Sequence, residues 1–332
     1  MGGFGVAAVY ESSVKGPSVL FRCDMDALPI REPEGTPHRS EVPGVSHKCG
    51  HDGHMAILAG LSAELSESPP RRGSVILLFQ PSEETGQGAA RVLEDESFRD
   101  LGPDMAFALH NLPGYSMGSL VIRNGVFASS SRGMKVELLG SSSHASEPHL
   151  GRSPASALAQ IIEACAALPQ SFIAMDHGAK ATVIHARLGE EAFGTSPGEG
   201  VVMATLRAHR PEDMERLASE AAALASSIAE AWGLGCSISW TQEFPSTVND
   251  PGAVKIAEDA AEDLGMQITR PVSPFPWSED FGHFTGAFPG ALMGLGAGTD
   301  SPALHSPDYD FPDDLIPVGV DLFKGIAHRI LG

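Results

Sequence analysis

One short segment of the chain, Lys48-Cys49-Gly50-His51-Asp52-Gly53-His54, places a cysteine and a histidine two residues apart. A thiolate and an imidazole are both good ligands for zinc-like ions. Two later segments supply the other groups that a metal-dependent hydrolase needs, Glu83-Glu84 and His110. We therefore expect the chemistry where these segments meet. A cysteine–histidine nucleophile pair is a weaker interpretation, because closeness along the chain does not by itself create the geometry for attack.

Three short apolar runs come before polar side chains of this kind. The runs are Val19–Arg22, Val75–Phe79 and Met105–Leu109, and the polar residues after them are Asp24, Glu83 and His110. Helical patterns lie between the runs, at Asp52–Leu65 and Gly88–Leu93. Strands that alternate with helices predict an α/β fold with a mostly parallel sheet. Side chains just past the ends of such strands gather along one edge, where open α/β sheets bind their ligands.

The middle of the chain has a different pattern. Its expected elements are a strand at Met134–Leu139, a helix at Pro154–Ala167, strands at Thr182–Leu188 and Val201–His209, a helix from Pro211 to about Trp232, and a strand at Ser237–Thr241. This order is typical of a ferredoxin-like α+β sandwich. The sequence thus predicts a catalytic domain at residues 1–124 and 241–332, with an inserted domain at 125–240. Loops are expected at Ser66–Gly73 and Thr195–Gly200.

The composition limits the class of protein. The 332 residues are 42% hydrophobic and 19% charged, which is typical of a soluble protein of one large or two ordinary domains. A formal charge of −20 argues against nucleic-acid binding, which needs a basic surface. No apolar run approaches the ~18 residues of a membrane span, and no secretory signal is visible. Four widely spread cysteines predict a reduced, cytoplasmic protein in which Cys49 is a ligand candidate and not half of a disulfide.

Six segments together carry a resemblance to a known group of enzymes. They are Phe21–Pro29, His47–His54, Phe79–Glu84, Gly140–His149, Ser278–Phe281 and Leu304–Pro307. With these segments in this order, the chain resembles the metal-dependent aminoacylase/carboxypeptidase superfamily, in particular the amidohydrolases that include hippurate hydrolase and the indole-3-acetyl-amino-acid hydrolases. The resemblance extends over almost the whole chain. It implies that the inserted domain serves as a lid or a dimerisation module.

The chain departs from the family pattern in two places. Family members usually carry several dozen residues before the counterpart of Gly3–Val6, and these form an N-terminal helical region and a first strand. Without that strand we expect an unpaired sheet edge, exposed apolar surface and lower stability than in a chain extended upstream. The family's asparagine-containing, proline-ended segment is also not recognisable, since Glu190–Gly200 stands in its place.

The resemblance assigns roles to single residues. It implies two divalent metal ions (Zn, Mn, Co or Ni), with Cys49 as the ligand that both share. The expected metal ligands are Cys49, His51, Glu84, His110 and His305. Glu83 is implied as the general base, which takes a proton from the activated water and passes it to the leaving amine. His144 is implied as a donor to the oxyanion, an interaction worth roughly 3–4 kcal/mol of barrier.

Other assignments rest on the residue types, and each has an ordinary structural alternative. Asp26 is a candidate to hold a ligand imidazole in place. The resemblance implies that Asp24 is not a direct ligand, because other branches of the superfamily place a metal histidine there. For both aspartates the alternative is a solvated strand end. Arg207 is a candidate to grip a substrate carboxylate, or else it forms a surface salt bridge. His149 is a candidate substrate contact, or else an ordinary loop residue.

Two acidic pairs remain to be explained. For Glu83-Glu84 the alternative to catalysis is a solvated acidic turn. Glu279 and Asp280 have no firm role in the sequence, and capping or support of the site is the expectation for them.

These expectations describe a two-domain α/β hydrolase that cleaves the amide bond of an N-acyl amino acid by metal-activated water. The expected partners are a small-molecule substrate and a second copy of the chain, bound through the inserted domain; neither nucleic acid nor membrane is expected. Two other classes stay open. One is a dipeptidase or carboxypeptidase with the same site, and the other is a catalytically impaired, truncated homologue that retains metal binding.

Overall fold

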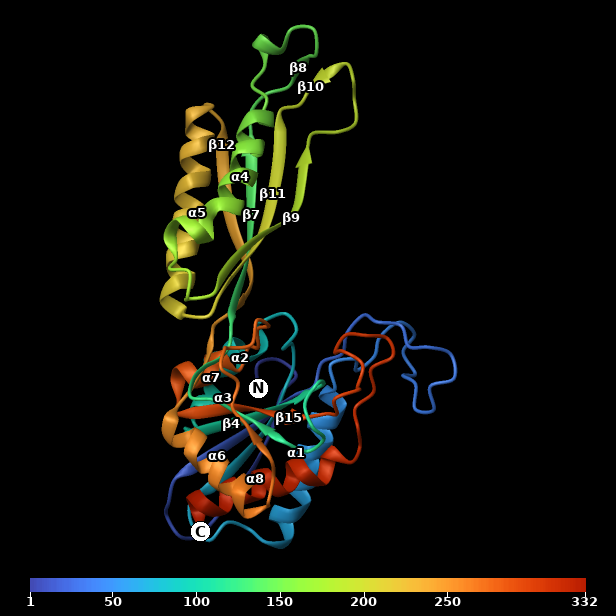
Figure 1. Ribbon diagram of the computed structural model, residues 1–332, viewed down its shortest axis with the longest axis vertical. Coiled ribbons are helices and arrows are strands. Elements are labelled where there is room, and N and C mark those ends of the chain that lie inside the picture. Colours follow the sequence, from blue (N-terminus) through green and yellow to red (C-terminus); the bar gives the residue numbers. More distant parts are fainter. The chain divides into compact units, whose positions relative to one another are not determined.

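The chain folds as two units (Figure 1), and the computed structural model describes residues 1–332 throughout. Unit 1 comprises residues 1–127, 247–274 and 279–332, and unit 2 comprises residues 128–246 and 275–278. The sequence predicts an insertion at 125–240. In the structure the chain passes between the units beside two short strands, β6 (Gly125–Ala128) and β13 (Thr247–Asn249).

Unit 1 is built on a seven-stranded sheet. Its strands are β1 (Val6–Glu11), β2 (Ser18–Asp24), β3 (Ser74–Gln80), β4 (Met105–Leu112), β5 (Leu120–Val121), β14 (Ile268–Thr269) and β15 (Gly290–Gly296). They lie in the order β1-β3-β2-β4-β15-β5-β14. The central strands β3, β2, β4 and β15 pair in parallel, whereas β1 is antiparallel to β3 and β5 is antiparallel to β15. The mostly parallel sheet predicted from the apolar runs is therefore confirmed.

Helices cover both faces of this sheet. They are α1 (His51–Glu67), α2 (Gly88–Glu94), α3 (Glu96–Arg99), α6 (Pro251–Asp263), α7 (Gly282–Ala287) and α8 (Leu315–Leu331). Val19 and Phe21 of β2 belong to the core that the sheet forms with α1, α6 and α8, while α2, α3 and α7 lie on the other side (Figure 1). Because both faces are covered, the central strands are apolar along most of their length.

The start of α1 is set by a glycine. Gly50 has a φ of +89°, a left-handed conformation that glycine adopts without steric cost. A Cβ at Gly50 would also lie 2.7 Å from an atom of the Asn111 side chain. The absence of a side chain at Gly50 therefore lets the chain turn from Cys49 into α1 directly against the end of β4.

Unit 2 is an antiparallel sheet with two helices on one face (Figure 1). Its main elements are β7 (Ser130–Leu139), α4 (Ala155–Phe172), β9 (Ala179–Leu188), β11 (Glu199–Ala208), α5 (Pro211–Ala231) and β12 (Gly235–Phe244). The strands lie in the order β12-β7-β11-β9. Val136, Ile161, Leu206 and Leu217 are buried in the core between the sheet and the helices. The fold class expected from the sequence, a mostly parallel sheet domain with an inserted ferredoxin-like domain, is confirmed.

The loop expected at Thr195–Gly200 is wrong in part. Thr195–Ser196 form strand β10, which pairs with β8 (Ser143–His144), and β11 begins at Glu199. A short 3₁₀ helix, Pro148–Leu150, follows β8. The glycines and proline of this segment favour a loop locally, but pairing with a strand distant in the sequence decides the conformation.

None of the helices is both long and apolar enough to cross a bilayer.

A tight contact between α1 and Phe311 yields a stability prediction. Alanine replacing glycine at an open helix position stabilises by about 1 kcal/mol. At Gly53, however, a Cβ would lie 2.3 Å from the Phe311 ring, and overpacking of this kind costs about 1–3 kcal/mol. We expect Gly53→Ala to lower the Tm of the metal-free protein in thermal unfolding. The control is Gly286→Ala in α7, where a Cβ meets nothing within 4 Å and Tm should hold or rise. Equal Tm values for Gly53→Ala and wild type would contradict this packing.

Candidate metal centre

Four segments bring polar residues to one edge of the sheet in unit 1. Cys49 and His51 lie where the chain enters α1, Glu83 and Glu84 follow β3, His110 lies near the end of β4, and His305 lies in the loop after β15. The carboxyl ends of the parallel strands β2, β3, β4 and β15 share this edge, which is where α/β sheets bind ligands.

The five residues expected to hold metal converge around the Cys49 thiol. Cys49, His51 and His110 form one group whose ligand atoms lie within 4.8 Å of one another, and Cys49, Glu84 and His305 form a second. The Sγ of Cys49 lies 3.5 Å from Nε2 of His110, and Oε1 of Glu84 lies 3.3 Å from Nε2 of His305. Because Cys49 belongs to both groups, its thiolate could contact two cations at once.

Backbone carbonyls orient two of the histidine rings. Nδ1 of His51 lies 2.9 Å from the carbonyl oxygen of Asp26, and Nδ1 of His110 lies 2.9 Å from that of Asn111. A carbonyl oxygen can only accept, so in the neutral rings these contacts put the proton on Nδ1, and Nε2 carries the lone pair that a cation would bind.

Two buried polar atoms at this edge make no hydrogen bond of good geometry, Nε2 of His51 and Oε1 of Glu84, although the latter lies 3.3 Å from Nε2 of His305. They lie 4.0 Å apart. A buried polar atom without a hydrogen bond typically costs about 1–3 kcal/mol, and cations held by the two groups would remove this cost. The donor set of thiol, imidazoles and carboxylate therefore fits divalent ions of the zinc type.

The titration behaviour of the ligands also bears on metal binding. Burial opposes the charged form of His51, but the negative charges of Asp24, Asp26 and Glu84 outweigh it and raise the pKa of His51 to about 9. Burial raises the pKa of the Cys49 thiol well above its usual value, and the neighbouring carboxylates add to the shift. Burial lowers the pKa of His110 to about 3, so this ring is neutral. Without metal, therefore, His51 and Cys49 both hold a proton near neutral pH.

The Glu83-Glu84 pair is not a solvated turn. Glu83 is only 5% exposed, and burial together with the negative charges of Glu279 and Asp280 raises its pKa well above the usual range. The Asp26 carboxylate accepts the backbone N–H of Glu83 and of Glu84, each at 3.0 Å. Asp26 thus contacts His51 through its backbone carbonyl and, at 3.6 Å, through its carboxylate, and the same carboxylate fixes the turn that carries the two glutamates.

A fully buried arginine, which sequence reasoning missed, joins several of these segments. The guanidinium of Arg22 lies 2.8 Å from Asp24, 3.0 Å from Glu279 and 2.7 Å from Asp280, and its Nε donates to Gln80 at 2.8 Å. The solvated-strand-end alternative is therefore wrong for Asp24, which is completely buried. The support expected of Glu279 and Asp280 takes the form of ion pairs with Arg22. The only sequence feature that points to a role for Arg22 is its charge at the end of the apolar run Val19–Arg22.

His54 is a second residue to which the sequence gave no role. Its Nδ1 lies 2.6 Å from Oδ1 of Asp24, and its Nε2 lies 2.5 Å from Oδ1 of Asn111. Asn111 in turn donates to the hydroxyl of the buried Tyr309. This chain of contacts connects the first turn of α1 with β2, β4 and the loop that carries His305.

The remaining predicted residues belong to unit 2. His144 is exposed in β8, with its Nδ1 2.6 Å from Oγ of Ser146. His149 is exposed in the short 3₁₀ helix. Arg207 in β11 donates to the carbonyl of Pro276 at 3.1 Å and to Oγ of Ser278 at 3.0 Å. Its guanidinium is thus engaged by neutral groups of unit 2.

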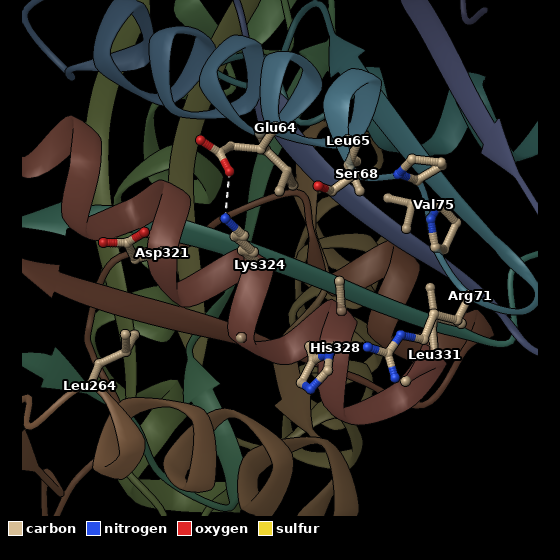
Figure 2. Close-up of a pocket in the computed structure, with 16 residues that line it drawn as sticks. Glu64, Leu65, Ser68, Arg71, Val75, Leu264, Asp321, Lys324, His328 and Leu331 are labelled. Carbon is tan, nitrogen blue, oxygen red and sulfur yellow. Dashed lines mark hydrogen bonds and ion pairs between the residues drawn. The ribbon is translucent and has the colours of Figure 1, made fainter.

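A cavity of about 520 Å³ lies between the last turns of α1 and α8 (Figure 2). Leu61 and Leu65 from α1 and Leu331 from α8 supply apolar lining, and Lys324 forms an ion pair with Glu64 at its wall. The donors around Cys49 lie at the opposite end of α1, which has 17 residues and is roughly 25 Å long at 1.5 Å per residue. The cavity is therefore separate from the candidate metal centre.

Comparison with known proteins gives a consistent result. The sequence profile described as peptidase family M20/M25/M40 matches residues 20–329. N-acetyl-L-cysteine deacetylase of Bacillus subtilis is 31% identical over 328 residues, which cover 98% of this chain and 78% of that protein. IAA-amino acid hydrolase ILR1-like 5 of Arabidopsis thaliana is 30% identical over 332 residues, which cover 97% of this chain and 76% of that protein.

Solved structures agree with the sequence relatives. The YXEP protein of Bacillus subtilis, described as a dinuclear metal binding peptidase from the M20 family, superposes with a TM-score of 0.82 at 26% identity, covering 98% of this chain and 85% of that one. A protein from methicillin-resistant Staphylococcus aureus superposes with a TM-score of 0.90 at 22% identity, covering 99% of this chain and 85% of that one. At this lower identity the second likeness supports the fold alone.

Metal uptake by this centre should release protons. Below pH 9 an incoming ion must displace the proton of His51, and it must also displace that of the Cys49 thiol, so affinity should fall as the pH is lowered. We expect about two protons per chain to leave at pH 7. Isothermal titration calorimetry in buffers of different ionisation enthalpy measures this number. Cys49→Ala should release one proton fewer, and a heat of binding independent of the buffer would contradict the scheme.

Proposed function

The chain is a hydrolase of peptidase family M20/M25/M40, and from this premise we propose that it cleaves the amide bond of N-acyl amino acids with two divalent metal ions. The observation that carries the proposal is the convergence of Cys49, His51, Glu84, His110 and His305 in two groups that share the thiol. Two relatives whose names describe cleavage of an acyl group from an amino acid support this substrate class.

When bound, the ions would lower the pKa of a water molecule and polarise the scissile carbonyl. Cys49, His51 and His110 would hold one ion, and Cys49, Glu84 and His305 would hold the other. The Nδ1 contacts to the carbonyls of Asp26 and Asn111 would keep the rings of His51 and His110 in place. The protein groups thus fix the geometry before the substrate arrives.

We assign proton transfer to Glu83. Its carboxylate is buried beside Glu84, and its backbone is held by Asp26. In the hydrolysis it would accept a proton from the attacking water and deliver that proton to the amine nitrogen as the amide bond breaks. A carboxyl group whose environment already favours the protonated form is a good acid for the second of these transfers.

The roles of the unit 2 residues are part of the proposal. We assign His144 as a donor to the oxyanion, His149 as a substrate contact and Arg207 as a ligand for the substrate carboxylate. A homodimer through unit 2 is also proposed, because its edge strand β9 exposes Ile184 and Leu188, and unpaired edges readily pair with another chain. All four cysteines are free thiols, which supports the proposed cytoplasmic location.

A substrate panel tests the proposed function. The purified protein is stripped of metal, reloaded with Zn, Mn, Co or Ni, and analysed for metal content. It is then assayed with N-acetyl, N-benzoyl and N-indoleacetyl amino acids, and with dipeptides. We expect two ions per chain and hydrolysis of the N-acyl amino acids. Faster cleavage of the dipeptides would identify a dipeptidase, and a loaded protein without turnover on any substrate would identify a metal-binding protein only.

Glu83→Gln separates the roles of the two glutamates. Glutamine is nearly isosteric but cannot accept the proton, so we expect kcat to fall by roughly 10²–10⁴ while both ions are retained. Elemental analysis and steady-state kinetics give the two readouts. Glu84→Gln is the matched comparison, and it should lose at least one ion. If Glu83→Gln also loses an ion, Glu83 is a metal ligand and the two assignments are reversed.

A further inference from the structure

Lys48, the residue before Cys49, is a buried lysine to which the proposed reaction gives no role. It is 3% exposed. Its Nζ donates to the carbonyl oxygen of Tyr309 at 2.8 Å and lies 3.1 Å from Oε1 of Glu32. A buried ammonium group is costly unless it is paired and hydrogen-bonded, and here both conditions are met. The Lys48 ammonium group therefore restrains both Tyr309 and Glu32.

The backbone of Lys48 holds the same segment a second time. Its carbonyl oxygen accepts the N–H of His305 at 2.7 Å. One residue thus binds both ends of the segment from His305 to Tyr309, at one end through its main chain and at the other through its side chain.

His305 needs such support more than the other proposed ligands do. Its φ is +65°, a left-handed conformation that is uncommon for a residue with a side chain and persists only where the surroundings enforce it. Its side chain is 50% exposed, whereas His51 and His110 are buried. Apart from its contact with Glu84 at 3.3 Å, little packing fixes the ring, and its position depends on the backbone on either side of it.

The contact with Glu32 connects Lys48 to a second loop, the one after β2. The second carboxylate oxygen of Glu32 accepts the N–H of Ser40 at 2.7 Å. Lys48 therefore joins three stretches of chain: the loop after β2, the segment that carries Cys49 and the loop after β15.

We propose that Lys48 is a positioning residue that holds the His305 segment against the Cys49 segment, and thereby sets the affinity of the second metal position, formed by Cys49, Glu84 and His305. The inference rests on the proposed metal centre. It does not depend on which amide bond is cleaved. A neutral side chain of similar length at this position should leave the first group, Cys49, His51 and His110, intact.

The first test needs no metal. Lys48→Met removes the charge and the donor but keeps most of the volume. Hydrogen exchange followed by mass spectrometry on the metal-free proteins should show faster exchange across the His305–Tyr309 segment in Lys48→Met than in wild type, with unchanged exchange in the middle of α1. Lys48→Met/Glu32→Gln, which also removes the carboxylate left unpaired, covers the case in which the single variant folds poorly. Lys324→Met is the control, since Lys324 is a half-exposed lysine that pairs with Glu64 far along α1.

The second test measures metal affinity. Groups that orient metal ligands typically change affinity by 10- to 100-fold, so titration of Lys48→Met should show one ion weakened by roughly that factor and the other unchanged. Combining Lys48→Met with His305→Ala should weaken binding no further than His305→Ala alone, because both act through one ligand.

The outcomes separate this proposal from the proposed function. Unchanged exchange at His305–Tyr309, equal weakening of both ions, or fully additive effects with His305→Ala would each overturn the role of Lys48. If wild type takes up no pair of ions, the proposed function fails, and the exchange experiment still decides whether Lys48 holds the segment.

Discussion

Unit 1 depends on a cluster of acidic side chains buried at one end of its sheet. Asp24, Glu83, Glu279 and Asp280 are each at most 5% exposed, and the guanidinium of Arg22 pairs with three of them. One fixed positive charge does not balance them. Burial, with Glu279 opposing the favourable effect of Arg22, raises the pKa of Asp280 to about 8. The pKa of Glu83 also lies well above its usual range. Burial and the neighbouring carboxylates therefore disfavour the charged forms of Glu83 and Asp280, and a nearby cation would relieve both effects.

The same cluster explains why segments far apart in the sequence meet at one place. Arg22 lies near the end of the buried strand β2 and binds carboxylates from the loop before α7. Asp280 also accepts the N–H of Ala89 in α2 and a hydrogen bond from Gln80 of β3. Each of these bonds satisfies a group that would be costly to bury alone. The scaffold is thus held by charged groups close to the proposed ligands. A change to one of them would alter both the fold and the metal chemistry.

Much of this structure follows from local pattern. The strands around Val19–Arg22 and Val75–Phe79 are recognisable because strands of a parallel sheet are covered on both faces and must be apolar throughout. The donors Cys49 and His51 are recognisable because they stand at the start of a helix, next to residues that match a family motif. The order of elements in unit 2 is also visible in the sequence, since each element is long enough to show its own period.

The rest is not local. Nothing near Arg22 in the sequence indicates that Glu279 and Asp280 will become its partners, and nothing near Lys48 points to the carbonyl of Tyr309. Strand β10 is invisible for the same reason, because its two residues form a strand only when β8 lies beside them. The Asp26 carboxylate lies 3.6 Å from the His51 imidazole, as expected, but nothing in the sequence indicates that it also fixes the backbone of Glu83 and Glu84. These contacts depend on which strands become neighbours in the sheet. A short window of sequence does not contain that information.

The uneven exposure of the ligands has a kinetic consequence. His51, His110 and Cys49 are at most 7% exposed, whereas the side chain of His305 is half exposed and that of Glu84 is 20% exposed. In the proposed centre, an ion held by Glu84 and His305 would exchange with solvent or pass to a chelator without movement of the buried ligands, whereas an ion held by His51 and His110 would be released more slowly. The shared thiolate would then separate a labile ion from a retained one. In purified protein, the metal at the exposed position would then reflect the ions present during purification. The metal at the buried position would reflect the ions present when the chain folded.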